Sequence, residues 1–515
     1  MLIKTYGAAV QGIDAIEVTI EVSVDKGIGV AIVGLPDAAV KESQERVRSA
    51  LKQLGMEFPR HHVVVNMSPA DVRKEGSAYD LPIAVGISVA AGLVNVASLE
   101  GYLLMGELAL DGSVLPVKGA LPMAIMARSK GYKGMIVPSA NVREAAVVNN
   151  LDVYGVSHLK EVFDLLTGEG GIKPTVIDTR AEFERAEDIA GYDFSDVKGQ
   201  EQVKRALEVA CAGGHNILLV GPPGAGKSMM AKRVPTILPP FTLAEALETT
   251  KIHSVAGKLK RGSMLMTSRP FRSPHHTISP VALVGGGTDP MPGEISLAHN
   301  GVLFLDEFPE FSRGVLEVMR QPLEDRHITI SRAKYTIDYP AGFMLVASMN
   351  PCPCGYYIHP TKQCICPPGA VQKYLNRISG PLLDRIDIQV EIFPVPFKDL
   401  SDTTPSESSS AIRDRVIEAR KIQQRRFAEH KNGYCNAMMT PALLRQYAMP
   451  DDEGMRRLEA AIKKFDLSAR AYDRILKVAR TIADLDGVAT VGKEQISEAI
   501  SYRNLDRSSW GVVNG

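Results

Sequence analysis

Apolar and polar residues alternate in the first third of the chain in the way that is typical of strands with one buried face. In the segment 15–24, apolar residues occupy every second position: Ile16, Val18, Ile20, Val22 and Val24. Successive side chains of a strand point to opposite faces, so this pattern predicts a half-buried strand. A second apolar run covers 28–33, and Asp37 is placed to cap a helix that ends at Gly55.

Two further features complete this first α/β domain. The sequence predicts a strand over 62–67 and a hairpin with Asp111 and Gly112 as its two-residue turn. The apolar segment 81–99 has the length of a membrane span, but it is rich in Ala and Gly and is interrupted by polar residues. We therefore expect a helix buried inside the domain, and no membrane contact.

Changes in composition divide the chain into five parts. Residues 1–167 form the α/β domain, and the glycine-rich, then charged stretch 168–190 predicts a linker. A second α/β block follows over 191–400. The polar run 401–411 has almost nothing to bury and predicts a flexible connection, after which 412–515 has the pattern of a helical domain. The expected fold class is α/β with a helical C-terminal part.

Composition narrows the class of protein. The chain has 515 residues, of which 45% are hydrophobic and 23% charged, values of an ordinary globular protein and not of a disordered one. Lys plus Arg and Asp plus Glu both number 59, so nucleic-acid binding would need basic residues concentrated locally. The first residues lack the apolar core of a signal peptide, and six cysteines are too few for a disulfide scaffold. We expect a cytoplasmic location.

The segment 221–228, with the sequence GPPGAGKS, is the clearest chemical signal. It follows the apolar strand 217–220 and precedes a helix. Glycines let the backbone N–H groups curl around phosphate, and the helix adds its positive end. The sequence predicts ATP binding, with Lys227 at the β- and γ-phosphates and the Ser228 hydroxyl on Mg²⁺. The predicted binding residues are Gly221, Pro222, Pro223, Gly224, Ala225, Gly226, Lys227 and Ser228.

Two later strands end in polar residues that fit the same site. The apolar run 302–305 is followed by Asp306 and Glu307. We expect Asp306 to hold Mg²⁺ and Glu307 to deprotonate the attacking water, because the base must lie one residue farther along. The strand 343–348 leads to Asn350, whose amide is a candidate sensor for the γ-phosphate and the water.

A hairpin and a cysteine cluster lie on either side of this third strand. The strands 328–330 and 335–339 alternate around a tip that carries Arg332 and Lys334, which are candidate DNA contacts. Four cysteines lie within fifteen residues: Cys352, Cys354, Cys364 and Cys366. In a reducing compartment they predict a structural Zn²⁺ site, with His359 as an alternative ligand; four reduced, uncoordinated thiols are the other interpretation.

The order of these motifs resembles that of AAA+ ATPases. The runs SPHHTIS, PMPGEISLAHNGVLFLDEFPEF, MNPCPCG and LLDRIDI are similar to those of the ComM/YifB family of magnesium-chelatase-like AAA+ proteins, and the likeness covers nearly the whole chain. It implies a Lon-protease-like N-terminal domain, an AAA+ core with a parallel sheet and a helical lid. It also implies a hexameric DNA motor, a branch-migration helicase of natural transformation, with single-stranded and branched DNA as partners.

The resemblance assigns four further residues and a role to the hairpin. Arg385 matches the arginine finger that reaches into the neighbouring subunit's ATP site, and Arg470 matches the sensor-2 arginine. Gly199 and Gln200 match the segment beside the adenine. The hairpin resembles the pore hairpin of this branch, so six copies would line a central channel with cations.

Three rival functions follow from the same resemblance. A Lon-like peptidase needs a serine and a lysine base, and Ser77 lies at or next to the serine position. The lysine position holds Leu121, and Lys118 is three residues earlier, so we expect no peptidase activity. Remodelling of protein substrates and insertion of a metal into a tetrapyrrole are the other two alternatives.

Overall fold

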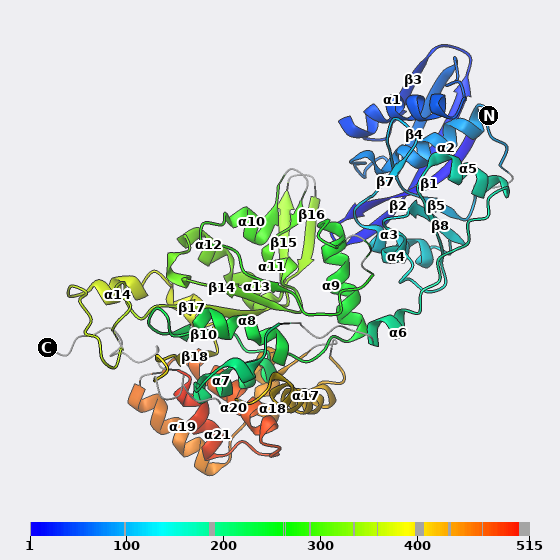
Figure 1. Cartoon of the computed structure of the whole chain (residues 1–515). Coiled ribbons are helices and arrows are strands. Elements are labelled where there is room, and N and C mark those ends of the chain that lie inside the picture. The colour runs from blue at the N-terminus through cyan, green and yellow to red at the C-terminus, as the bar shows by residue number, and fades with distance from the viewer. Residues whose placement is uncertain are drawn as a thin grey trace. The chain divides into compact units, whose positions relative to one another are not determined.

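The chain folds into two compact units. The computed structural model describes residues 2–96, 99–184, 191–260, 262, 264–287, 290–332, 335–357, 359–396, 406–430, 434–465 and 467–503. The first unit combines Met1–Ala186 with Ala246–Met266, and the second combines Glu187–Glu245 with Thr267–Gly515 (Figure 1). Residues 246–266, which lie within the predicted second α/β block, therefore fold with the first unit.

The first unit is built on a mixed seven-stranded sheet with the strand order β3-β4-β2-β1-β5-β8-β9. Its strands are β1 (Leu2–Gln11), β2 (Asp14–Asp25), β3 (Gly29–Val33), β4 (His62–Ser68), β5 (Tyr102–Leu104), β8 (Gly134–Pro138) and β9 (Asp152–Val156). Its helices are α1 (Ala38–Gln53), α2 (Asp80–Ala90), α3 (Ala120–Ser129), α4 (Val142–Ala145), α5 (Leu159–Thr167), α6 (Thr179–Glu184) and most of α9 (Leu243–Val255). Parallel pairing of β1 with β5, β5 with β8 and β8 with β9 gives one half of the sheet its α/β character.

Local patterns account for most of this unit. In β2, Val18, Ile20 and Val22 are fully buried, as the alternation predicts. Asp37 caps α1, because its Oδ1 accepts a hydrogen bond of 2.8 Å from the Val40 backbone N–H. Every residue of α2 is buried, as predicted, but the helix ends at Ala90 and covers only the first part of the apolar segment 81–99. Among the described residues, no helix is long and apolar enough to cross a membrane.

Two further details of the first unit differ from the sequence prediction. The hairpin forms between β6 (Glu107–Leu108) and β7 (Val114–Leu115), but Ala109 N–H donates to Ser113 O, so three residues and not two make the turn. Gly112 sits at φ +91° and supplies the left-handed position of that longer turn. The predicted linker 168–190 also packs on the unit, since Thr179 Oγ1 donates a hydrogen bond to Val147 O at 2.9 Å. Thr179 is the first residue of helix α6 within that linker.

The second unit contains a five-stranded parallel sheet with the order β11-β14-β17-β10-β18. Its strands are β10 (Ile217–Val220), β11 (Phe271–Arg272), β14 (Val302–Leu305), β17 (Met344–Met349) and β18 (Ile388–Glu391). Its core helices are α7 (Glu201–Gly213), α8 (Lys227–Ile237), α10 (Pro280–Val284), α11 (Glu294–Leu297), α12 (Arg313–Val318), α13 (Arg320–Asp325), α14 (Ala370–Leu375) and α15 (Gly380–Leu383). Strands β10, β14 and β17 are buried throughout, as parallel strands covered on both faces require.

Smaller paired elements lie outside the main sheet. An antiparallel hairpin is formed by β15 (His327–Arg332) and β16 (Tyr335–Pro340). The glycine run at 285–287 contributes β12 (Gly285–Gly286), which pairs with β13 (Met291–Pro292). A Cβ on Gly285 would lie 2.5 Å from Met291 O, so this pairing requires glycine there.

The C-terminal helices form a lid that shares one hydrophobic core with the parallel sheet. They are α17 (Ser409–Arg426), α18 (Pro441–Tyr447), α19 (Asp452–Phe465), α20 (Ala469–Leu485) and α21 (Lys493–Ser501). Helix α17 begins inside the predicted flexible connection 401–411, because the Ser408 side chain caps it by accepting from Ala411 N–H. Residues 401–405 of that connection lie outside the described residues.

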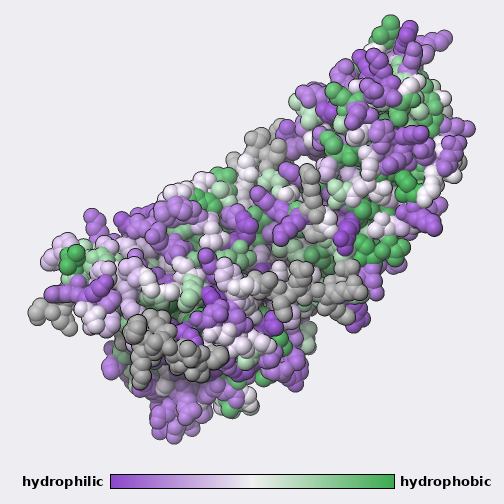
Figure 2. Space-filling model, viewed as in Figure 1, coloured by the Kyte–Doolittle hydropathy of each residue, from purple (hydrophilic) through white to green (hydrophobic). Residues whose placement is uncertain are grey.

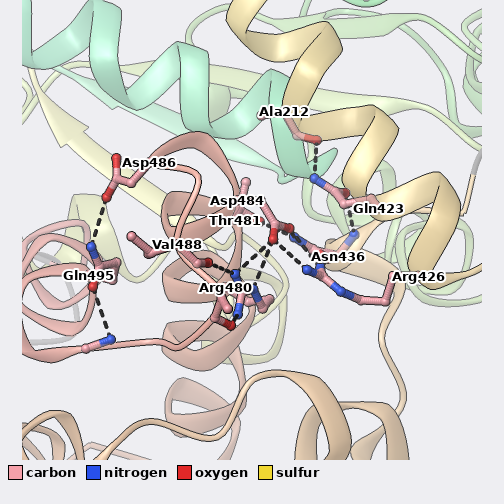
Figure 3. A network of polar contacts seen from close by, with 12 residues as sticks. Ala212, Gln423, Arg426, Asn436, Arg480, Thr481, Asp484, Asp486, Val488 and Gln495 are labelled. Carbon is pink, nitrogen blue, oxygen red and sulfur yellow. Dashed lines mark hydrogen bonds and ion pairs between the residues drawn. The ribbon is translucent and has the colours of Figure 1, made fainter.

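A buried polar network ties the lid together (Figure 3). At its centre, the Asp484 carboxylate accepts hydrogen bonds from Arg426, Arg480 and Asn436 at 2.6 to 3.1 Å. Gln423 of α17 donates to Ala212 O of α7 at 3.0 Å, which joins the lid to the core helix.

Hydrophilic residues cover much of the face shown in Figure 2, with apolar residues scattered among them.

Candidate nucleotide-binding site

The topology of the second sheet brings the three predicted motifs together. Strands β14, β17 and β10 are neighbours and run parallel, so their carboxyl ends meet at one edge. The segment 221–228 leaves β10 there, Asp306 and Glu307 follow β14, and Asn350 follows β17. Open parallel sheets place ligands at this kind of edge.

Lys227 joins two of these motifs. Its Nζ donates to Gly221 O at 2.6 Å, to Pro222 O at 3.0 Å and to Asn350 Oδ1 at 3.1 Å. Burial lowers the pKa of Lys227, and the carboxylates of Asp306 and Glu307 oppose that shift. The ammonium is therefore fixed at the centre of the loop, where it can exchange these acceptors for phosphate oxygens.

The glycines of this loop have separate roles. Gly224 and Gly226 adopt φ values of +80° and +91°, which other residues rarely take. Gly221 is needed for packing, because a Cβ there would lie 2.3 Å from Ile392 O. Helix α8 begins at Lys227, so its free N–H groups face the same loop. The conformation is suited to holding an anion.

Asp306 is surrounded by donors. One carboxylate oxygen accepts from Ser228 Oγ at 2.7 Å, and the other accepts from Ser348 Oγ and from Glu307 N–H. Hard oxygen ligands of this kind are what Mg²⁺ prefers, so Ser228 and Asp306 fit the metal. Sequence reasoning missed Ser348; its place next to last in β17 was the available signal.

Glu307 has an unusual backbone and a partner that the sequence did not predict. It sits at φ +54°, a strained region for a residue with a Cβ. Its side chain is 58% exposed, and Oε2 lies 3.2 Å from His276 Nδ1. The His276 ring packs against that of His275, with centroids 4.1 Å apart and the ring planes tilted by 34°. The run SPHHTIS carries both histidines, but nothing in their local pattern identifies the contact.

The two predicted arginines lie elsewhere in the second unit. Arg385 donates to Pro381 O at 2.6 Å and pairs with Glu324, while Arg470 pairs with Asp384 at 3.3 Å. Within the part of the chain that the structure describes, neither has a hydrogen bond or ion pair with the residues around Lys227.

The segment that carries Arg385 is fastened to lid helix α20. Arg474 Nη1 lies 3.0 Å from Asp387 Oδ1, and His215 Nδ1 lies 3.0 Å from Asp387 Oδ2. Burial alone would raise the pKa of Asp387, but Arg474 and His215 lower it below the ordinary value. Burial also lowers the pKa of His215, which favours the neutral ring. Neither His215 nor Arg474 was identified from the sequence.

Gly199 and Gln200 lie beside the carboxyl end of β18. Both adopt left-handed backbone conformations, with φ of +61° and +62°, and Gln200 precedes α7. Gln200 Nε2 donates to Phe393 O at 2.5 Å, while the preceding Ile392 donates its N–H to Val220 O. These contacts bring Gly199 and Gln200 near the start of the 221–228 loop.

The predicted DNA-contact residues are only partly described. The hairpin register ends with Arg332 opposite Tyr335, which extends β15 by two residues beyond the predicted strand. Lys334 and the side chain of Arg332 lie outside the described residues.

The four clustered cysteines converge. Their Sγ atoms all lie within 4.8 Å of one another, and all four thiols are free. The group with this geometry does not include His359, whose Nδ1 accepts hydrogen bonds from the backbone of Thr361 and Lys362. Among the described residues, this is the one group of three or more Cys, His, Asp or Glu side chains with metal-site geometry.

Comparison of the sequence with known proteins shows the family to which this chain belongs. Family models described as "Magnesium chelatase, subunit ChlI", "Subunit ChlI of Mg-chelatase" and "Magnesium chelatase, subunit ChlI C-terminal" match residues 193–400, 20–141 and 406–503. The uncharacterized protein YifB of Escherichia coli is 44% identical over 504 residues, which cover 97% of this chain and 96% of YifB. The competence protein ComM of Haemophilus influenzae is 42% identical over 508 residues, which cover 98% and 97%. The chain belongs to the ComM/YifB family.

Membership confirms the resemblance drawn from the sequence. The chain is an ATPase of the ComM/YifB type, with ATP and Mg²⁺ as the cofactors that its family implies. Its fold is a Lon-protease-like α/β domain, an AAA+ core with a parallel sheet and a helical C-terminal region. A Lon protease of Halothermothrix orenii is 29% identical over 166 residues, which cover 29% of this chain and 20% of that protease.

In the Lon-like unit of this ComM/YifB protein, Leu121 occupies the position where the resemblance predicts the lysine of a peptidase. Ser77 Oγ donates to Glu107 Oε2 at 2.5 Å. Leu121 is fully buried in the hydrophobic core, where it cannot serve as a base. Lys74 is also buried, and burial lowers its pKa, but its Nζ donates to Pro69 O. The absence of peptidase activity stays a prediction.

Proposed function

We propose that this protein is an ATP-driven, hexameric DNA motor that acts as a branch-migration helicase during homologous recombination. One observation carries the proposal. The phosphate loop, the two carboxylates and Asn350 gather around Lys227, whereas Arg385 is held by Glu324 on another part of the same unit. A second copy of the chain would supply the missing guanidinium, as in rings whose sites lie between subunits.

Each gathered residue has a role in this proposal. Lys227 and the backbone N–H groups of 221–228 would bind the β- and γ-phosphates, and Ser228 and Asp306 would hold Mg²⁺. Bound Mg²⁺ would neutralise charge that develops on the phosphates. Glu307 would take a proton from the attacking water, and Asn350 would orient that water, because its amide already reaches Lys227.

Residues outside the loop would complete the cycle. Arg385 would stabilise the transition-state charge in the neighbouring subunit's site, and Arg470 would act as sensor 2. Gly199 and Gln200 would contact the adenine, since they lie beside β18 near the loop.

The β15–β16 hairpin is the proposed DNA contact. In a chain with no net charge, phosphate binding needs a local cluster of cations, and six hairpin tips with Arg332 and Lys334 would supply one. The relative from Haemophilus influenzae is a competence protein, which supports DNA as the substrate. Such a substrate and the free thiols support a cytoplasmic location.

ATP hydrolysis with and without DNA tests the proposal. We expect single-stranded DNA and a four-way junction to raise the ATPase rate, and ATP to drive migration of the junction. Replacing Arg332 and Lys334 by Ala should remove the stimulation. Replacing Lys463 and Lys464 of lid helix α19 is the matched control and should retain it. A rate that no DNA changes would contradict a DNA motor and favour remodelling of protein substrates.

A further inference from the structure

The cysteine cluster has the dimensions of a tetrahedral metal site. Three of its Sγ–Sγ distances are 3.3, 3.6 and 3.7 Å, between Cys352, Cys354 and Cys364. A zinc ion with Zn–S distances of about 2.3 Å has sulfur atoms about 3.8 Å apart. Four soft thiolates favour Zn²⁺ over Mg²⁺ or Ca²⁺. The site is closed, so its role would be structural.

The metal loop touches the phosphate loop directly. Gly355, which follows Cys354, packs so closely on Pro223 that an added Cβ would lie 2.6 Å from Pro223 Cδ. Gly355 N–H donates to Cys352 O at 3.0 Å, and Cys352 is fully buried. The backbone beside the thiols is therefore in close contact with Pro223 of the nucleotide-binding segment 221–228.

Both ends of the metal loop are also fastened at the nucleotide site. Asn350, two residues before the first cysteine, accepts from Lys227 Nζ at 3.1 Å. The backbone N–H of Asn350 bonds to the hydroxyl of Tyr374, which lies in α14 beyond the last cysteine. A metal ion bound by the four cysteines would close the loop between Asn350 and Tyr374 and reduce its conformational freedom. The positions of Asn350 and Tyr374 would then be better defined.

We propose that the four cysteines bind one Zn²⁺ ion per chain and that the bound ion braces the phosphate loop, so that metal binding and ATP binding favour each other. The coupling rests on the nucleotide site of the proposed function and not on DNA or on a hexamer. Linkage makes the effect reciprocal: Zn²⁺ raises the affinity for ATP by the same factor as ATP raises the affinity for Zn²⁺.

Metal removal from the full-length wild-type protein tests both parts. Zinc content would be measured by elemental mass spectrometry, and binding of a fluorescent ATP analogue by titration, before and after dialysis against a chelator and after adding back ZnCl₂. We expect one Zn²⁺ per chain, an increase in Kd of about fivefold or more on removal, and recovery on addition. Replacing Cys364 and Cys366 by Ser should mimic the chelated protein.

A glycine variant separates the brace from the metal. Gly355→Ala keeps all four thiols, so zinc should stay at one per chain, while the contact with Pro223 is disturbed and ATP binding weakens. Gly369→Ala is the matched control, because Gly369 has a similar φ of +77° but open space around its Cβ position. It should leave both measurements unchanged.

Each outcome decides one part of the proposal. Protein that neither contains nor takes up stoichiometric zinc would overturn the metal site. Zinc that can be removed and restored with no change in nucleotide affinity would overturn the brace. If the untreated wild-type protein does not bind ATP at all, the nucleotide site itself is overturned, and the coupling with it. The zinc content would still decide whether the four cysteines bind a metal.

Discussion

At the scale of single residues, Glu307 shows how the protein positions a proposed base. Its left-handed backbone turns the side chain away from the direction that the strand would give it. Asp306 accepts the Glu307 N–H, and His276 contacts the carboxylate. Such strain is retained where the surrounding contacts over-determine it, which is typical of catalytic positions.

The His276 contact leads to a prediction about turnover. We expect His276→Ala to lower kcat by about tenfold with little change in the KM for ATP, because His276 touches the proposed base and not the phosphate loop. Steady-state ATPase kinetics would measure both constants. His275→Ala is the comparison variant: His275 bonds to Thr277 and packs on the His276 ring but does not contact Glu307, so its effect should be smaller. A higher basal rate in the His276 variant would mean that this histidine restrains the base.

At the scale of elements, helix α20 connects the core to the lid. Arg470 and Arg474, one turn apart, hold Asp384 and Asp387, the acidic residues on either side of Arg385. About three turns farther along the helix, Asp484 organises the network of Figure 3. One helix therefore positions the proposed arginine finger and fixes the lid.

Arg474 should act through the position of Arg385. Arg474→Ala removes the ion pair of 3.0 Å to the buried Asp387, so the 384–387 segment loses one of its anchors. We expect kcat to fall about tenfold while the affinity for ATP changes little, with partial recovery in Arg474→Lys, which restores the charge. ATPase kinetics and nucleotide titration give the two values. Equal losses in both values would indicate general damage to the fold. Arg457→Ala, at an exposed position of α19, is the control.

The Asp484 network should dominate the stability of the lid. Asp484→Asn removes a fully buried carboxylate and leaves Arg426 and Arg480 without their counter-charge. We expect a loss of about 3 kcal/mol in the free energy of unfolding, which calorimetry would detect as a lower melting temperature. Glu418→Gln, which breaks an exposed pair with Lys421 of 2.7 Å, should cost less than about 0.5 kcal/mol. Similar effects of the two changes would contradict this view of the network.

At the scale of the whole molecule, the proposal depends on sites that two chains complete. In the described residues, Arg385 bonds to Pro381 and Glu324 and not to the phosphate loop, and a nucleotide would have to replace its ion pair with Glu324. The chain has no net charge, and the sequence predicts two cations, Arg332 and Lys334, at the hairpin tip. Both features fit a molecule that concentrates its positive charge in one place.

Mixed assemblies would test the shared site. Arg385→Ala and Glu307→Gln proteins should each be inactive alone, because one lacks the finger and the other the base. In a one-to-one mixture, about a quarter of the seams would combine an intact pocket with an intact finger, so about a quarter of the wild-type ATPase rate should return. Glu307→Gln mixed with Lys227→Ala offers no intact pocket and should stay inactive. No recovery in the first mixture would contradict a site shared between subunits.

The sequence by itself determined the elements and the motifs that depend on neighbouring residues. The alternation in β2, the Asp37 cap, the buried α2 and the order of strand, glycine loop and helix at 217–237 are local patterns. Their geometry follows from side-chain periodicity and backbone preferences, which act within a few residues. The family resemblance then supplied Arg385 and Arg470, which no local pattern identifies.

Only the tertiary structure decided which distant residues meet. His276 reaches Glu307 across 31 positions, Ser348 reaches Asp306 across 42, and Gly355 reaches Pro223 because β10 and β17 are adjacent. The packing of 172–184 on the first unit and the early start of α17 also depend on surfaces that other segments provide. Strand order sets these contacts, and strand order is a property of the whole sheet, so the residues on either side of each contact cannot reveal it.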